Sequence, residues 1–229
     1  MEYNVAISRD LENKGFSIVN AEIETYMSLC ESLGEIVGNA DANNGKNFVE
    51  VSNSASYQKL GFSNKGLFPH TDRSVLESPP DIVSLFCCNQ PERGGESILF
   101  DSRKIYENEK LRNIFDIQCL FSDESHSDFL FSSVFYEENG RICVRFRNDS
   151  FIYVNPPDAM KFKSVCKIIQ QQSSSFLLRP NQALFINNKT PFSTFRLHQQ
   201  IKLKRWIAKL FVNENANCVR QDFSCNTIC

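Results

Sequence analysis

The sequence lacks both an excess of charge of one sign and a long apolar run, features that mark several common protein classes. Its 25 Lys and Arg residues stand against 27 Asp and Glu residues, a formal net charge of −2, so no broad cationic surface favours a nucleic acid partner. No apolar run approaches the roughly 18 residues that cross a bilayer. The first fifteen residues carry acidic side chains and no apolar segment typical of a secretory signal. We therefore expect no nucleic acid and no membrane as partners.

Signature motifs of several enzyme classes are also missing. The chain has no G-x-S-x-G, no Walker loop, no G-x-G-x-x-G and no H-E-x-x-H, so serine hydrolase, nucleotide-phosphate and zincin sites lack their parts. Histidine is scarce, and only His70, His126 and His198 are available as imidazole ligands or bases. Few candidate sites that depend on histidine are therefore possible.

Cysteine is present nine times, but never in a C-x-x-C spacing. An odd number of scattered cysteines is typical of reduced thiols that fill core positions, which favours a cytoplasmic location. Cys225 and Cys229 at the carboxyl end leave two interpretations open, a metal or cross-linking pair or a mobile terminus.

The size and composition indicate one globular domain. The chain has 229 residues, of which 41% are hydrophobic and 20 are Phe, enough to form a substantial core. No internal repeat divides it. We expect a single domain over residues 1–229 that binds a small molecule, and no feature of the sequence indicates its oligomeric state.

The pattern of apolar residues and turn signals predicts many strands and few helices. Helices are expected over residues 20–33, with Asn20 as cap, about 101–115, and 158–172. The inner face is expected to be Ile23, Met27, Cys30 and Leu33 in the first helix and Phe162, Val165, Cys166 and Ile169 in the last. Strands are expected at residues 15–19, 47–51, 81–88, 96–100, 119–122, 134–136, 141–146, 183–186 and 201–212. Asn139-Gly140 predicts a hairpin between two of them, because a type I′ turn needs two residues that accept positive φ. Without regular βαβ alternation, this order favours an α+β, mostly β class with antiparallel sheets, for which a jelly roll is one economical arrangement.

His70 and Asp72 form the first candidate site. In an extended segment, residues two apart project from the same face, so an imidazole and a carboxylate are expected to point together. Such a pair can supply two adjacent ligands of a divalent metal, as in the facial triad of Fe(II) oxygenases. The alternative is a hydrogen-bonded or surface histidine near a turn.

The last predicted strand carries a second candidate site. Arg205 and Lys209, with Ile207 and Phe211, alternate onto one face. Two cations among apolar groups favour an anionic ligand such as a dicarboxylate. The alternative is a strand edge protected by charged residues.

These motifs together resemble the taurine/2-oxoglutarate dioxygenase (TauD/TfdA) family over roughly residues 34–212. The matching segments are Pro69-His70-Thr71-Asp72, Pro79-Pro80, Gly94-Gly95-Glu96-Ser97, Arg205 and Lys209. The resemblance implies a double-stranded β-helix, a jelly-roll barrel with flanking helices, that uses Fe(II) and the cosubstrate 2-oxoglutarate to oxidise a small molecule. It assigns His70 and Asp72 to iron and to catalysis.

For the cosubstrate, the resemblance implies contacts from four positions. Ser97 takes the place of a family threonine and retains its hydroxyl, and Arg205 matches the first of two family arginines. Lys209 stands where the second arginine is expected, which keeps the charge but loses the bidentate fork. Arg196 matches an arginine that assists near the mouth of the barrel.

The chain departs from the family pattern at the second iron histidine. Counting from Asn188 places Ser193 in that position, and counting back from Arg205 places Thr194 there. A hydroxyl is a poor Fe(II) ligand beside imidazole. Three explanations stay open: His198 reaches the metal through a bulged loop, water or substrate completes the shell, or iron catalysis has been lost.

The sequence therefore supports two hypotheses. The first is an Fe(II)/2-oxoglutarate oxygenase with an altered iron site, and the second is a barrel of the same family that binds or transforms a small metabolite without iron. The loops at residues 52–65 and 121–133 are expected to set substrate specificity. His126 is expected at the surface, and the row of Arg141, Arg145 and Arg147 is expected either to meet a carboxylated substrate or to face solvent.

Overall fold

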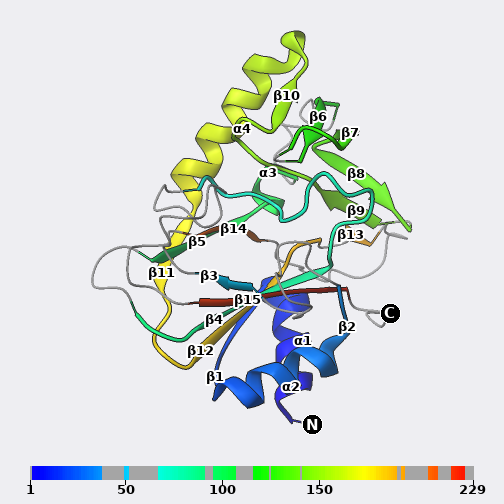
Figure 1. Ribbon diagram of the computed structural model, residues 1–229. Coiled ribbons are helices and arrows are strands. Elements are labelled where there is room, and N and C mark those ends of the chain that lie inside the picture. Colours follow the sequence, from blue (N-terminus) through cyan, green and yellow to red (C-terminus); the bar gives the residue numbers. More distant parts are fainter. Residues whose placement is uncertain are drawn as a thin grey trace.

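The computed structural model describes residues 2–37, 49–51, 67–90, 95–106, 116–123, 125–139, 141–189, 192–193, 206–210 and 218–224. In these parts of the chain the fold is built from antiparallel sheets with helices on their outer sides (Figure 1). The helices are α1 (Glu2–Lys14), α2 (Ile23–Leu33), α3 (Arg103–Tyr106) and α4 (Ala159–Gln172), with a short 3-10 turn at Pro156–Asp158.

The largest sheet has six strands. It runs in the order β1, β12, β4, β15, β2, and β3 also pairs with β15. The strands are β1 (Phe16–Asn20), β2 (Glu35–Ile36), β3 (Val49–Val51), β4 (Ile82–Cys87), β12 (Gln182–Asn187) and β15 (Cys218–Ser224). Every residue of β4 is buried, which explains why this strand reads as a continuous apolar run rather than an alternating one.

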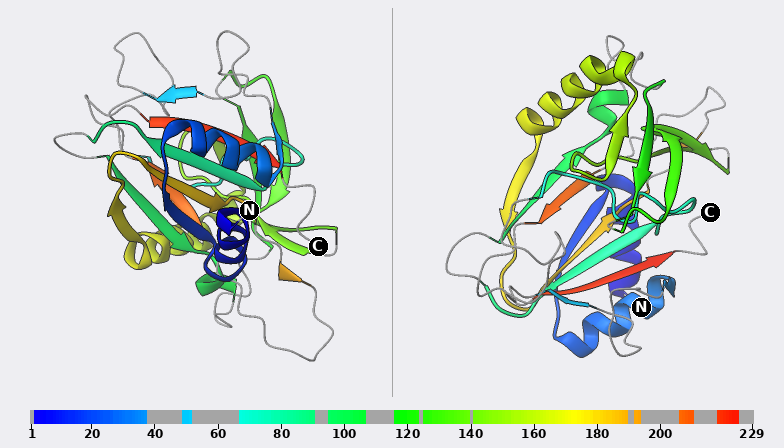
Figure 2. Two further views of the ribbon diagram at one scale, coloured as in Figure 1. Left: turned by 90° about the horizontal axis from the view of Figure 1, so that it is seen from below. Right: turned by 45° about the horizontal axis from the view of Figure 1, so that its top comes forward.

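Helices α1 and α2 cover one side of this sheet, as the view from below shows (Figure 2). Their buried side chains form one cluster with alternate residues of β4 and β12, including Phe86 and Phe185. Of the inner face predicted for α2, Cys30 and Leu33 are buried and Met27 packs partly buried against the cluster, but Ile23 is exposed. Tyr26 and Leu29 are also buried and were not predicted. Asn20 ends β1 and Glu22 occupies the cap position of the helix, so the predicted cap was wrong.

A three-stranded sheet lies on the other side, in the order β11, β5, β14. Its strands are β5 (Glu96–Asp101), β11 (Ser174–Leu177) and β14 (Trp206–Leu210). Between the two sheets a core cluster joins Leu85 and Leu184 of the large sheet to Leu99 of β5. The next residue, Phe100, belongs to a different cluster with α4, as the alternation of side chains along a strand requires.

Two smaller sheets and α4 complete the described part of the chain. The first runs in the order β10, β6, β7 and the second in the order β13, β9, β8. Their strands are β6 (Gln118–Ser122), β7 (Phe129–Ser133), β8 (Phe135–Glu138), β9 (Arg141–Val144), β10 (Ile152–Val154) and β13 (Phe192–Ser193). Phe162, Val165 and Ile169 of α4 pack against these sheets, and Cys166 packs partly buried beside them. These four residues are the inner face predicted for that helix.

The predicted hairpin at Asn139 is confirmed. Glu138 pairs with Arg141 across a two-residue connection between β8 and β9. Asn139 has a φ of 51°, the left-handed conformation that a type I′ turn requires of its first central residue.

The α+β class is confirmed, because helices and antiparallel strands are both present and every described strand pair is antiparallel. The described strands form four separate sheets rather than one closed barrel. Helix α1 and strands β2, β7, β10, β11, β13 and β15 were not predicted, and β7 lies in a segment expected to be a loop. Of the helices in the described segments, none has the length and apolar character needed to cross a membrane.

Candidate functional site

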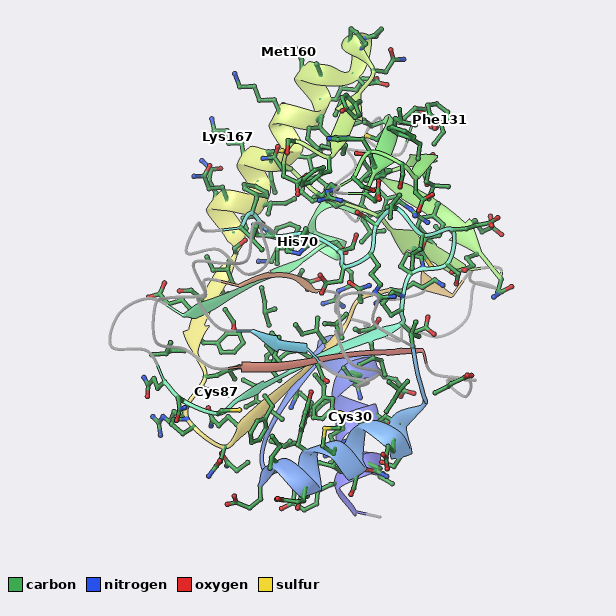
Figure 3. The ribbon with its side chains drawn as sticks, in the orientation of Figure 1. Cys30, His70, Cys87, Phe131, Met160 and Lys167 are labelled. Atoms are coloured by element: carbon green, nitrogen blue, oxygen red, sulfur yellow. The ribbon has the colours of Figure 1, made fainter. Side chains whose placement is uncertain are left out.

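His70 and Asp72 converge as the sequence predicted. The Nε2 atom of His70 lies 3.3 Å from Oδ1 of Asp72, and the two side chains are 23% and 15% exposed. In Figure 3 His70 lies near the middle of the molecule, between the large sheet and the smaller upper sheets. The pair is therefore partly buried but reachable from outside, as a ligand site must be.

The proton of His70 can be assigned from its second nitrogen. Nδ1 lies 2.8 Å from the carbonyl oxygen of Phe68, and because a carbonyl oxygen only accepts, Nδ1 carries hydrogen. In the neutral imidazole, Nε2 then presents a lone pair towards the Asp72 carboxylate. Two acceptors at this separation repel each other unless a proton or a cation lies between them, so the pair is suited to a divalent metal.

The residue between them, Thr71, fixes this segment to the rest of the fold. Its backbone N–H donates to the carbonyl of Phe146 at 2.7 Å, and its Oγ1 accepts from the Phe146 N–H at 3.0 Å. Thr71 and Phe146 are 3% and 1% exposed. The alternation that places Thr71 in the core turns His70 and Asp72 away from it together.

Ser97 is buried in β5, two residues after Gly95. Gly95 has a φ of 78°, a conformation that favours glycine and starts the strand at this point. Ser97 is 2% exposed. In the pairing of β5 with β14, Ser97 lies opposite Leu210, whereas Lys209 lies opposite Ile98.

Most of the remaining predicted site residues lie where the structure describes no side chain. Arg196, Arg205, Thr194 and His198 lie outside the described residues, and Ser193 is described only as the backbone partner of Arg141 in β13. Within the described segments, no group of three or more His, Cys, Asp or Glu residues is placed to hold a metal ion. The described part of the chain thus brings two of the predicted ligands together and leaves the third position untested.

The arginine row is not arranged as predicted. Arg145 is 2% exposed and donates to the backbone carbonyls of Ser74 at 2.5 Å, of Glu77 at 3.0 Å, and of Leu76. Burial lowers its pKa, while the nearby Tyr136 opposes that shift. Arg145 therefore binds its own chain, in the segment that directly follows Asp72, and faces neither solvent nor an open cavity.

Arg147 also has an intramolecular partner. Its guanidinium forms a bidentate pair with Asp149, with both N–O distances at 2.8 Å, and lies 4.9 Å from the centroid of the Phe151 ring. The two alternatives stated for this row, a carboxylated substrate or solvent, are thus wrong for the buried Arg145, while the half-buried Arg147 is paired within its own chain. The strand that would have aligned them ends at Val144.

A buried lysine beside the site was not singled out by the sequence. Lys189 is 7% exposed, and its Nζ lies 2.5 Å from Oε2 of Glu138 and 2.9 Å from Oγ of Ser78. This ion pair links the end of β12 to β8 and to the segment after Asp72. Only the three-dimensional structure reveals this ion pair, because Glu138 and Lys189 are far apart in the sequence and belong to segments of different sheets.

His126 is at the surface, as expected. Its backbone has a φ of 55° and its Nδ1 lies 3.2 Å from Oγ of Ser122. The neighbouring Asp123 accepts hydrogen bonds from the side chains of Ser125 and Ser127, and these bonds lower the pKa of its carboxyl group. The loop is organised by hydrogen bonds among its own side chains.

The sequence of this chain matches a known protein family. Residues 4–190 match the family described as "Taurine catabolism dioxygenase TauD, TfdA family". No curated protein matches the sequence. Among solved structures, the fold is similar to that of the non-heme iron oxygenase OrfP in complex with Fe and alpha-ketoglutaric acid, with a TM-score of 0.71 and 15% identity, covering 97% of this chain and 77% of that one.

Two further structures are similar. A taurine dioxygenase from Burkholderia xenovorans has a TM-score of 0.67 and 14% identity, covering 98% of this chain and 82% of that one. An asparagine oxygenase in complex with Fe(II), 2S,3S-3-hydroxyasparagine and succinate has a TM-score of 0.67 and 13% identity, covering 93% and 78%. At these identities the likeness concerns the fold.

Proposed function

The chain belongs to the TauD/TfdA family of dioxygenases, and we propose that it is an Fe(II)- and 2-oxoglutarate-dependent oxygenase that oxidises a small molecule. The observation that carries the proposal is the convergence of His70 Nε2 and Asp72 Oδ1 at 3.3 Å. An imidazole lone pair and a carboxylate oxygen aimed at one point are the donors that Fe(II) takes in such sites.

His70 and Asp72 are proposed to hold the iron. The proton on Nδ1 of His70 is engaged by the Phe68 carbonyl, an arrangement that orients a ligating imidazole and fixes its tautomer. When bound, iron and 2-oxoglutarate would supply the oxidative chemistry. The protein would supply orientation and a partly buried site.

The third protein position on the metal is proposed to be filled by water. Ser193 and Thr194 carry neutral hydroxyls, and His198 stands four or five residues beyond the expected column. This altered iron site distinguishes the chain from the family pattern. Weaker iron binding is the expected consequence, because one imidazole ligand is replaced.

The cosubstrate is proposed to bind Ser97, Arg205 and Lys209, with Arg196 assisting. The burial of Ser97 between the two sheets supports this placement, since a hydroxyl at that depth can meet a ligand carboxylate away from bulk water. The four positions are carried over from the family pattern. We also propose that residues 1–229 form one domain of double-stranded β-helix architecture.

The substrate is proposed to be a small molecule. Similar folds hold (3S)-hydroxy-L-Arg in OrfP and 2S,3S-3-hydroxyasparagine in asparagine oxygenase. A reducing, cytoplasmic setting is proposed as well, supported by the scattered cysteines, of which six lie in the described residues outside any disulfide.

The proposal is tested by anaerobic titration of the protein with Fe(II) and 2-oxoglutarate. We expect a visible metal-to-ligand charge-transfer band that is lost in His70→Ala and kept in His126→Ala, the control at an exposed histidine. A folded wild-type protein that develops no band at millimolar iron would overturn the proposal.

A second candidate function is a family member that binds a small metabolite without iron. It is favoured by the sequence, in which Ser193 or Thr194 stands where the family pattern places the second iron histidine. The same titration separates the two functions, because an iron-free binder shows no charge-transfer band although it binds 2-oxoglutarate or a related dicarboxylate by calorimetry.

A further inference from the structure

The side chain of Asn188 forms hydrogen bonds with both the backbone N–H and the backbone carbonyl of Asp72. The Asp72 N–H donates to Oδ1 of Asn188 at 2.8 Å, and Nδ2 of Asn188 donates to the Asp72 carbonyl at 3.1 Å. The same Nδ2 also donates to the carbonyl of Pro80 at 2.9 Å. One carboxamide thus satisfies both polar groups of the residue that carries the proposed iron carboxylate, as a neighbouring strand would do.

Asn188 is itself held rigidly. It directly follows β12, whose last residue, Asn187, pairs with Ile82 of β4. Its backbone N–H donates to the Asp81 carbonyl at 2.8 Å, and its side chain is 6% exposed. A carboxamide at the end of a central strand has little freedom to move, so it can transmit the position of the large sheet to Asp72.

His70 is positioned by a different set of contacts. Its ring is oriented by the Phe68 carbonyl, and the adjoining Thr71 is bonded to Phe146. Neither the Phe68 contact nor the Thr71–Phe146 contacts involve Asn188. Loss of the Asn188 side chain is therefore expected to move the carboxylate of the pair while the imidazole stays in place.

We propose that Asn188 is a positioning residue that acts through Asp72: its carboxamide sets the direction from which the Asp72 carboxylate meets His70 Nε2, and so sets the affinity of the site for a divalent metal. This inference rests on the proposed function, because it takes the His70 and Asp72 pair as the metal site. Partners of metal ligands are typically worth about 10- to 100-fold in metal affinity.

The test measures binding of Ni(II) by calorimetry, because Ni(II) binds nitrogen and oxygen ligands more tightly than Fe(II) and keeps weakened variants within range. We expect Asn188→Ala to raise the Kd about tenfold or more. In an Asp72→Ala background the same change is expected to alter the Kd less than about twofold, since the residue it acts through is gone. Asn187→Ala is the matched control, because that buried carboxamide bonds to the backbone of Lys189 at 3.2 Å and not to Asp72.

Each outcome decides one question. If wild type binds no Ni(II), or if His70→Ala binds it equally well, the proposed metal site is wrong and the role of Asn188 falls with it. If wild type binds at His70 and Asn188→Ala binds with the same Kd, only the role of Asn188 is overturned. An equal loss in the Asp72→Ala background also overturns it. If Asn188→Ala does not fold, Asn188→Ser, whose hydroxyl can keep one of the three bonds, replaces it in the same comparison.

Discussion

The guanidinium of Arg145 lies over the ring of Tyr136, with its central carbon 4.8 Å from the ring centroid. The ring of Phe121 is 5.9 Å away, so the cation contacts two aromatic faces as well as three backbone carbonyls. A buried cation without such groups is costly. Here rings and carbonyls replace water, and they tie β8 and the end of β9 to the segment that follows Asp72.

We expect Arg145→Met to lower the free energy of unfolding by about 2–4 kcal/mol, because the carbonyls of residues 74, 76 and 77 lose a charged donor while the side-chain volume is nearly kept. Arg145→Lys is expected to lose almost as much, since an ammonium lacks the planar fork. Urea unfolding followed by circular dichroism measures both. The exposed Arg179 provides the control: Arg179→Met should stay within about 0.5 kcal/mol of wild type. A loss below about 1 kcal/mol for Arg145→Met would show that the carbonyls find other donors.

The contact between α2 and the large sheet depends in part on a buried hydroxyl pair. Tyr26 Oη lies 2.7 Å from Ser84 Oγ, and both residues are 0% exposed. Tyr26→Phe is expected to lower the free energy of unfolding by about 1 kcal/mol. A double-mutant cycle of Tyr26→Phe with Ser84→Ala should give a coupling energy between the two hydroxyls of about 0.5–1.5 kcal/mol. Strict additivity of the two changes in urea unfolding would mean that the hydroxyls do not stabilise one another.

Buried thiols should make the protein less stable at alkaline pH. Burial raises the pKa of Cys30 and Cys166 to about 11 and that of Cys119 to about 12, from an ordinary value of 9.0. A thiol with a raised pKa keeps its proton in the folded state when the unfolded chain has lost it. Above about pH 9 the unfolded state therefore binds fewer protons, and stability falls as pH rises towards these folded values.

The free energy of unfolding, measured from pH 8 to pH 11 under reducing conditions, checks this sign. The decline in wild type is expected to be steeper than in Cys30→Ala, because that variant removes one raised pKa while the other titrating groups are shared. A Cys30→Ala slope equal to that of wild type would indicate that Cys30 titrates normally.

Much of the fold could be predicted because local signals and tertiary packing agree at most strands. They disagree in part at α2, where periodicity placed Ile23 on the inner face and left out the buried Tyr26. Burial of Tyr26 in the structure follows from its stacking on Phe86, with centroids 5.0 Å apart, and from its bond to Ser84. These partners are about 60 residues away, and a local pattern carries no information about them.

Strand β7 was missed for a related reason. Its residues Phe129 and Phe131 are 53% and 68% exposed, so the strand has no buried face of its own to produce the usual alternation. It exists because it pairs in register with β6, where Phe131 lies opposite Leu120. Such an edge strand is specified by its neighbour rather than by its own sequence.

For the site, the H-x-D spacing sufficed to predict that His70 and Asp72 converge, because alternation along an extended segment is a local property. Arg145, Asn188 and Lys189 could not be assigned in this way. Each acts on the segment after Asp72 from a distance of about 70 or more residues in sequence. Their roles follow only from how the sheets bring the chain together.

Substitution of His198 by Ala tests the third metal position. We expect the Ni(II) affinity to stay within about twofold of wild type, because His198 lies four or five positions beyond the column where the family pattern places its second histidine. His70→Ala in the same titration should abolish binding, since it removes a nitrogen ligand. A loss of about tenfold or more in His198→Ala would instead identify this residue as the third ligand and exclude water from that position.

For Lys209, the family pattern and the register of β14 with β5 predict different roles. The pattern makes Lys209 a cosubstrate ligand, whereas the register places Leu210 opposite Ser97 and Lys209 opposite Ile98. We expect Lys209→Met to weaken 2-oxoglutarate binding about tenfold or more, as loss of a charge-assisted contact requires. Lys167→Met, on the exposed outer side of α4 (Figure 3), should leave the affinity unchanged. If Lys209→Met also leaves it unchanged while Ser97→Ala weakens binding, the register is the better guide and Lys209 is not a ligand.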